Sequence, residues 1–109
     1  MDTQRTPISK TVQDQVTAFA TEVKKIAPDA KVILFGSQTA GTASPGSDID
    51  ICVVTRQFGN DYHGGTVTLL SLAHKFTIPM DVIPYTPGDL NNKYDPLAKE
   101  IRTQGTVVG

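Results

Sequence analysis

The first third of the chain carries apolar residues at helical spacing. Between positions 9 and 27 they recur every three or four residues, which places them on one face of an amphipathic α-helix: Val12, Val16, Phe19, Val23 and Ile26. Ser9 could cap this helix, or Thr6 could do so with Pro7 as the first helical residue. Pro28 ends it, because proline cannot continue the helical hydrogen-bond ladder. The pattern predicts one long helix before the first strand.

Three short apolar runs predict β-strands. The run at 31–35, KVILF, is apolar at almost every position, as expected for a strand buried on both faces. The run at 48–55, DIDICVVT, forms the second strand, and residues 80–83 form the third, with prolines marking both of its ends as loop or sheet edge. Residues 37–47 are small and turn-forming, which predicts a short helical turn and then a loop.

Two further helices complete the pattern. The first spans about residues 65–76, with Val67, Leu70 and Ala73 facing inward, although the glycine pair before it leaves its start open. The segment after the third strand is a loop or a short turn of helix. The last helix has Asp95 as its N-cap and a proline directly after it, ends at a glycine, and docks through three apolar residues: Leu97, Ala98 and Ile101.

The order helix–strand–strand–helix–strand–helix predicts a single α/β (α+β) domain over residues 1–109. We expect a short mixed β-sheet backed by helices on one face. Hydrophobic residues make up 39% and charged residues 19% of the chain, a balance that favours a globular fold with one core over disorder.

Charge and cysteine content exclude several classes of function. The formal net charge is −1, whereas a binder of nucleic-acid phosphates needs a basic surface, so no direct nucleic-acid binding is expected. The single cysteine, Cys52, allows no internal disulfide, is too few for a zinc site, and is expected to pack as a small apolar residue. The sequence shows neither a signal peptide nor a run of transmembrane length, so we expect a soluble cytoplasmic protein without membrane contact.

Two aspartates interrupt the second strand. Asp48 and Asp50 point to one face of it, about 6.6 Å apart, while Ile49 and Ile51 point to the other face and the core. Aligned carboxylates repel each other unless a cation lies between them, and Mg²⁺ is the usual ion for carboxylate and phosphate oxygens. Asp81 repeats the pattern on the third strand, so the three could hold two metal ions for a displacement at phosphorus if the strands are neighbours. The alternative is that Asp48 caps the strand and Asp50 is merely exposed.

A Gly-Ser pair precedes this acidic strand. Gly36 lets the backbone turn sharply after the first strand. Ser37 then opens a short helix whose N–H groups and hydroxyl could bind a phosphate. The sequence contains no Gly-Lys-Ser/Thr of a P-loop, no G-x-G-x-x-G of a dinucleotide site and no EF-hand ligand spacing.

These residues resemble a known family. Gly36-Ser37, ten residues and then Asp48-Ile49-Asp50 match the G-S-x10-D-x-D signature of the polymerase-β-like nucleotidyltransferases, and Asp81 is similar to their third carboxylate. The small size and the ending DPLAKEIRTQGTVV look most like the minimal nucleotidyltransferases, or MNT proteins. Many of those are the antitoxins of HEPN–MNT toxin–antitoxin pairs.

The resemblance implies a function for each motif residue. Asp48 and Asp50 would bind Mg²⁺ that bridges the phosphates of a nucleoside triphosphate such as ATP, and Asp81 would complete a second metal site and help to deprotonate the acceptor hydroxyl. The product would be a nucleoside monophosphate on that hydroxyl, with release of pyrophosphate. The implied catalytic and metal-binding set is therefore Asp48, Asp50 and Asp81, and the implied nucleotide-binding set is Gly36, Ser37 and Ser47.

The chain differs from the family in its first turn, and it is small for a complete transferase. The family often has G-S-R-A-R-G after the first strand, whereas this chain has Gly36-Ser37-Gln38-Thr39-Ala40-Gly41 and lacks both arginines. Arg56 could replace them, or it could simply be a solvated strand end. The chain also has little room for a domain that presents the acceptor.

The acceptor site would therefore belong to a second subunit of a homo-oligomer, or the acceptor would be a partner protein. The resemblance implies a HEPN toxin modified on a hydroxyl, plausibly of a tyrosine. A small-molecule acceptor of the aminoglycoside type and a non-catalytic module that neutralises a toxin by binding alone are the alternatives.

Overall fold

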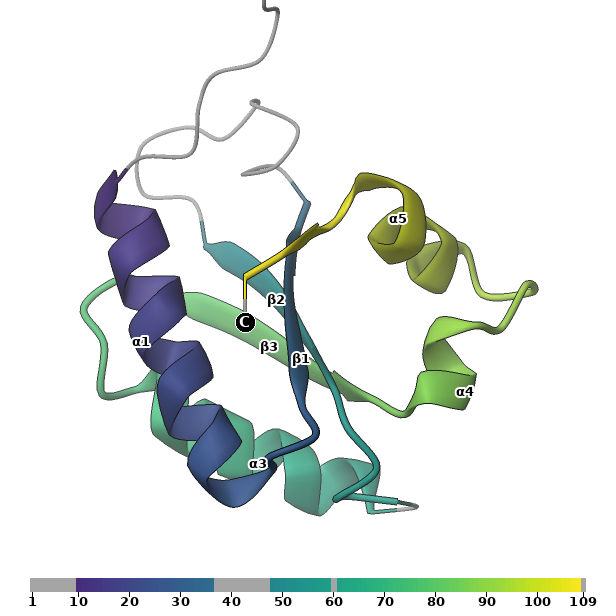
Figure 1. The fold of residues 1–109 in the computed structure, drawn as a ribbon, viewed down its shortest axis with the longest axis horizontal. Coiled ribbons are helices and arrows are strands. Elements are labelled where there is room, and N and C mark those ends of the chain that lie inside the picture. The colour runs from purple at the N-terminus through teal and green to yellow at the C-terminus, as the bar shows by residue number, and fades with distance from the viewer. Residues whose placement is uncertain (1–9, 37–47, 60, 109) are drawn as a thin grey trace, which may run out of the picture.

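The computed structural model describes residues 10–36, 48–59 and 61–108. The predicted short helical turn, together with Ser37 and Ser47, lies outside these residues. Within them the chain forms four helices and four strands (Figure 1). They are α1 (Lys10–Ile26), β1 (Lys31–Phe35), β2 (Ile49–Val54), α3 (Tyr62–Ala73), β3 (Met80–Tyr85), α4 (Pro87–Leu90), α5 (Pro96–Gln104) and β4 (Thr106–Val107).

The strands form one mixed sheet in the order β3-β2-β1-β4. β1 pairs antiparallel with both β2 and β4, whereas β2 and β3 run parallel because α3 carries the chain back between them. The predicted mixed sheet is therefore confirmed. β4, which follows the helix stop at Gly105, was not predicted, although Thr106 and the valines after it are β-branched residues typical of strands.

Helices cover both faces of the sheet, as Figure 1 shows, with α1 and α3 on one side and α4 and α5 on the other. The expectation of helices on one face only is wrong. Alternate residues of β1 explain the second layer, because Leu34 packs toward α1 and α3 while Ile33 and Phe35 face the opposite side. There Ile101 of α5, only 1% exposed, packs in a smaller core together with the fully buried Cys52. The prediction that Cys52 packs as an apolar residue is confirmed.

α1 is the amphipathic helix that the spacing predicts. Its buried residues are Val12, Val16, Phe19, Ala20 and Val23. Ile26, the last residue of the predicted stripe, is instead 44% exposed, and Ala27 directly after it is buried. No helix in the described part of the chain is both long enough and apolar enough to cross a membrane.

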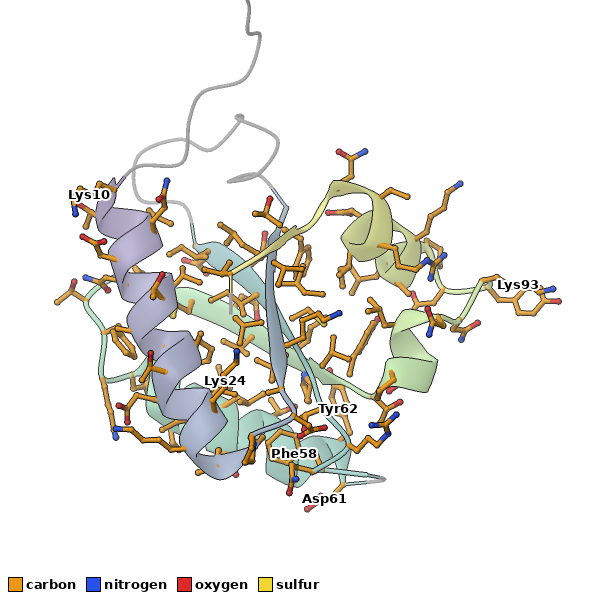
Figure 2. All side chains as sticks on the ribbon, viewed as in Figure 1. Lys10, Lys24, Phe58, Asp61, Tyr62 and Lys93 are labelled. Atoms are coloured by element: carbon orange, nitrogen blue, oxygen red, sulfur yellow. The ribbon has the colours of Figure 1, made fainter. Side chains whose placement is uncertain are left out.

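α3 begins three residues earlier than predicted and contains both glycines. Asp61 caps it by accepting a hydrogen bond from the N–H of Gly64 at 2.9 Å, and Figure 2 shows Asp61 beside Phe58 and Tyr62 at this end of the molecule. A Cβ on Gly65 would lie 2.7 Å from the Phe58 ring, so the close packing of that ring requires glycine.

The buried face of α3 differs from the predicted one. The buried stripe runs at four-residue spacing through Gly65, Leu69 and Ala73. Leu70 is half-buried, and Val67 is 51% exposed, so the prediction that Val67 faces inward is wrong. The prediction for Ala73 is confirmed.

β3 and α5 follow their predicted signals closely. β3 continues two residues further than expected and includes Pro84, which is tolerated because β3 is an edge strand, as its prolines indicated. Asp95 caps α5 by accepting a hydrogen bond from the N–H of Leu97, and it also accepts one from the hydroxyl of Tyr85 at 2.7 Å. The cap thus fixes the start of α5 to the end of β3.

The end of β2 is tied to the turn before β1 by Asp29. Its two carboxylate oxygens accept hydrogen bonds from the hydroxyl of the buried Thr55 at 2.6 Å and from the backbone N–H of Arg56 at 2.9 Å. These hydrogen bonds, first that of Arg56 and then that of Thr55, lower the pKa of Asp29. They favour the ionised carboxylate, so the folded state binds the proton less tightly than the unfolded chain.

We expect this contact to make stability depend on acid pH. Because the folded-state pKa is lowered, the stabilisation is complete above the ordinary aspartate range and is lost as pH falls through the folded-state value. Urea unfolding across that pH range should show that the free energy of unfolding falls more steeply with decreasing pH for the parent than for Asp29→Asn. Asp14→Asn, which removes an exposed ion pair with Lys10, is the control and should keep the parent's profile.

Candidate active site

The three predicted carboxylates come together at one end of the sheet. Asp50 and Asp81 are direct partners in the parallel register of β2 and β3, and their side chains share one face. Asp48 lies just before β2 and two residues from Asp50, so it belongs to the same end. Ile49 and Ile51 are fully buried on the opposite face, as expected. The condition that the sequence left open, that the second and third strands are neighbours, is met.

Asp50 lies in an unfavourable environment for a negative charge. It is partly buried, and burial is the largest cause that raises its pKa, followed by the charges of Asp81, Asp48 and Glu100. All three charged groups that act on it are carboxylates. Ionised Asp50 would therefore be stabilised by a nearby positive charge, such as a bound cation.

Glu100 is an acidic neighbour that the sequence did not reveal. It lies on α5 directly before the buried Ile101, which packs against the same face of the sheet that carries Asp50. Its place on an ordinary amphipathic helix offered no signal, because only the docking of α5 on the second face brings it close to the aspartates.

Gly36 forms the turn beside this acidic group. It has φ +79°, a left-handed conformation that glycine adopts without strain. It follows Phe35, the register partner of Asp50, and a Cβ placed on it would lie 2.2 Å from Oδ2 of Asp50. Gly36 is thus required both by the turn and by the close approach of the Asp50 carboxylate.

Among the described residues, no positive charge is a cause of the pKa shift of Asp50. Arg56 follows the far end of β2, about 20 Å along the strand from Asp50, and it is exposed, with its backbone bonded to Asp29. The idea that it replaces the missing arginines is wrong; it is a solvated strand end. Figure 2 shows Lys93 at the tip of the connection between α4 and α5, and the guanidinium of Arg102 donates to the carbonyl of Leu90 at 2.6 Å.

The described acidic side chains of the site offer oxygen donors to a cation. Carboxylates are the ligands that Mg²⁺ prefers, so the chemistry of Asp48, Asp50 and Asp81 fits that ion. Over the residues that the structure describes, no three Asp, Glu, His or Cys side chains stand close enough to form a ready-made metal site. The exposed side chains of Asp48 and Asp81 would therefore have to turn toward Asp50 around the ion.

A family model matches most of the chain. The model of the nucleotidyltransferase domain aligns with residues 16–105, a segment that contains β1, β2, β3 and all three aspartates. A relative, the poly(A) RNA polymerase GLD2 of Danio rerio, is 36% identical over 66 residues. That match covers 61% of this chain and 14% of the polymerase, so the chain corresponds to about one seventh of that relative.

Solved structures with the same fold include toxin–antitoxin proteins. One, a toxin–antitoxin with AMP-PNP, has a chain that aligns with a TM-score of 0.61 at 23% identity, over 89% of this chain and 72% of that chain. A mutant of the toxin–antitoxin MntA-HpeT aligns with a TM-score of 0.60 at 21% identity, with the same coverage. An inferred nucleotidyltransferase from Sulfolobus solfataricus gives 0.54 at 19% identity, over 91% and 86% of the two chains. At these identities the likeness establishes the fold.

Proposed function

Because this chain belongs to the nucleotidyltransferase domain family, we propose that it transfers AMP from ATP to a hydroxyl group, with Mg²⁺ as its cofactor. The observation that carries this proposal is the register pair of Asp50 and Asp81, with Asp48 two residues away and Gly36 against the Asp50 carboxylate. Such an arrangement repels itself without a cation, so its presence is best explained by metal-dependent chemistry.

The proposed reaction uses the carboxylates in two ways. Asp48, Asp50 and Asp81 would hold Mg²⁺, which when bound neutralises the triphosphate and polarises its phosphorus. Asp81 is exposed at the start of an edge strand, so an acceptor can reach it, and its carboxylate would take the proton of the acceptor hydroxyl. The acceptor oxygen bonds to the α-phosphorus, and the bond from that phosphorus to the pyrophosphate oxygen breaks.

The turn after β1 would bind the phosphates of the donor. Gly36 follows the last residue of β1 and lies beside Asp50. We propose that it acts with Ser37 and Ser47, both outside the described residues, on the terminal phosphates of ATP. AMP-PNP in a structural relative supports a nucleoside triphosphate as donor.

We propose that the acceptor is a toxin protein and that the two proteins meet in the cytoplasm. HEPN-type toxins are the first candidates to test. Two structural relatives are toxin–antitoxins, which supports this choice. The Danio rerio relative suggests RNA instead. The net charge of −1 and the carboxylates around Asp50 disfavour a polyanionic acceptor. A cationic small molecule of the aminoglycoside type would fit these charges and is the third acceptor to test.

A second candidate function is neutralisation of a toxin by binding alone. The remote position of Arg56 favours it, because neither of the usual arginines is present and this one cannot reach the triphosphate. Weak charge compensation would lower nucleotide affinity. The aspartates favour catalysis, since an inactive site would keep their repulsion without benefit.

Labelled ATP separates the two functions. The protein should be incubated with ATP and Mg²⁺, with and without a HEPN-type toxin encoded beside it, and Asp48→Asn compared with the parent. Transfer of label by the parent and not by the variant supports catalysis. If the toxin stays unlabelled and Asp48→Asn neutralises it as well as the parent does, the transferase proposal is wrong.

Mg²⁺ and ATP together should stabilise the folded parent. At a ligand concentration about 100 times its Kd, binding to the folded state adds about 2.7 kcal/mol to the free energy of unfolding. We expect a clear rise in the melting temperature of the parent and little or none in Asp48→Asn. Asp14→Asn is the control with an unchanged site and should respond as the parent does. Equal shifts in parent and Asp48→Asn would place the nucleotide elsewhere.

A further inference from the structure

The two edges of the sheet are built differently. β3 forms one edge and carries Pro84, which has no N–H to offer, and the charged Asp81; both discourage pairing with another strand. β4 forms the other edge, and Thr106, Val107 and Val108 carry neither charge nor proline. Val107 is 58% exposed. Among the residues that the structure describes, those of the β4 edge lack the side-chain protection against pairing that the β3 edge has.

The backbone of Val107 points toward this free edge. The N–H of Val108 donates to the carbonyl of Val32 at 2.8 Å, so Val32 and Val108 form a hydrogen-bonded pair of the antiparallel ladder. Such pairs alternate with pairs that are not hydrogen-bonded, and Ile33 with Val107 is therefore of the second kind. The N–H and carbonyl of Val107 thus face away from β1, where a further strand would meet them.

An uncharged groove lies beside this edge. It has a volume of about 330 Å³ and runs between the first half of α1 and β4. None of the described residues that line it is ionisable, and its floor includes the buried Val16 and Leu34. The residues that line it are Gln13, Val16, Thr17, Leu34, Thr106, Val107 and Val108.

We propose that β4 of a second copy of this chain occupies the edge, which joins two sheets across a two-fold axis at Val107. An antiparallel pair of identical strands places each residue against its symmetry mate, so like charges would face each other and repel. The uncharged β4 edge and its groove avoid this penalty, whereas the β3 edge would bring two Asp81 side chains into the interface. The charge pattern thus favours self-pairing at β4.

The register of this interface follows from the two-fold axis. Val107 of each copy would exchange both backbone hydrogen bonds with Val107 of the other, and Thr106 would lie opposite Val108 of the other copy. Because β4 has only two residues, strand pairing alone is weak. Burial of the groove beside β4, which Gln13 and Thr17 of α1 line in part, would add to it. Asp50 and Asp81 lie on β2 and β3 and Asp48 directly before β2, away from this edge, so the inference does not rest on the proposed function.

Cysteine cross-linking tests this interface directly. In a hydrogen-bonded antiparallel pair the two Cα atoms are about 5.5 Å apart, so Val107→Cys should react with its symmetry mate through a short thiol cross-linker. Val67→Cys on α3 is the matched control, because Val67 is a valine of similar exposure, 51% against 58%, outside the interface. The natural Cys52 is buried, and burial raises the pKa of its thiol to about 12, so it adds no background.

We expect Val107→Cys to form covalent dimer at least about tenfold faster than Val67→Cys does, because association raises the effective concentration of the two thiols. Sedimentation of the parent and of two lysine variants gives the second measurement. We expect a concentration-dependent dimer for the parent and for Val67→Lys, and a monomer for Val107→Lys. Equal cross-linking of the two cysteine variants, or a parent that stays monomeric at high concentration, overturns the proposal and leaves the edge to a different protein.

Discussion

Replacing Asp50 by asparagine is expected to lower the rate of nucleotidyl transfer by at least about 10³-fold while raising the melting temperature at neutral pH. The two effects have one cause. Asp50 is partly buried, and its burial, followed by the charges of Asp81, Asp48 and Glu100, raises its pKa. Asparagine keeps the shape of the side chain, removes the charge that repels its neighbours, and removes the anionic oxygen that a metal ion needs.

The opposite signs of the two effects distinguish a functional residue from a structural one. A structural carboxylate loses stability when it is neutralised, as Asp29 should, because its hydrogen bonds favour the charge. Asp14→Asn, which removes an exposed carboxylate on α1, is the control and should leave both rate and melting temperature close to those of the parent. An Asp50→Asn protein that is less stable than the parent, or that transfers label at the parental rate, would contradict the proposed site.

The facing of the aspartates could be predicted because it depends on local geometry. Alternation along a strand puts Asp48 and Asp50 on one face and Ile51 on the other without knowledge of any neighbour. The position of Asp81 opposite Asp50 could not be predicted in the same way, because it depends on the parallel pairing of β2 and β3. The sequence predicts it only if these two strands are neighbours.

The parts that escaped prediction all depend on contacts between distant segments. Glu100 reaches the acidic group only because α5 packs on the second face of the sheet, and nothing in the amphipathic pattern of α5 says which face it will cover. The apolar spacing of Val67, Leu70 and Ala73 predicts one inward face for α3, whereas packing buries Gly65, Leu69 and Ala73, with Gly65 against Phe58. Sequence periodicity identifies that a helix has an apolar face, whereas contacts with distant segments determine which of its residues are buried.

Gly36→Ala is expected to impair both folding and activity, and Gly59→Ala shows how much of that comes from the backbone alone. Both glycines have positive φ, +79° and +51°. A left-handed conformation costs a residue with a Cβ about 1–2 kcal/mol. A Cβ on Gly59 meets nothing within 4 Å, whereas one on Gly36 would lie 2.2 Å from Oδ2 of Asp50. Urea unfolding should therefore show a loss of about 1 kcal/mol for Gly59→Ala and a further 1–3 kcal/mol for Gly36→Ala.

Activity separates the two variants more sharply than stability does. To relieve the overlap the carboxylate of Asp50 must move by about 1 Å, and a displacement of that size at reacting groups costs about 10²-fold in rate. Gly59→Ala should retain the parental rate, because its added methyl group touches nothing. Asp50→Ala supplies the last control. Combined with Gly36→Ala it removes the clashing oxygen and leaves the Cβ of residue 50 at 3.2 Å, so most of the added stability cost should disappear. An unchanged cost in the double variant would mean that Gly36 serves the turn alone and does not position Asp50.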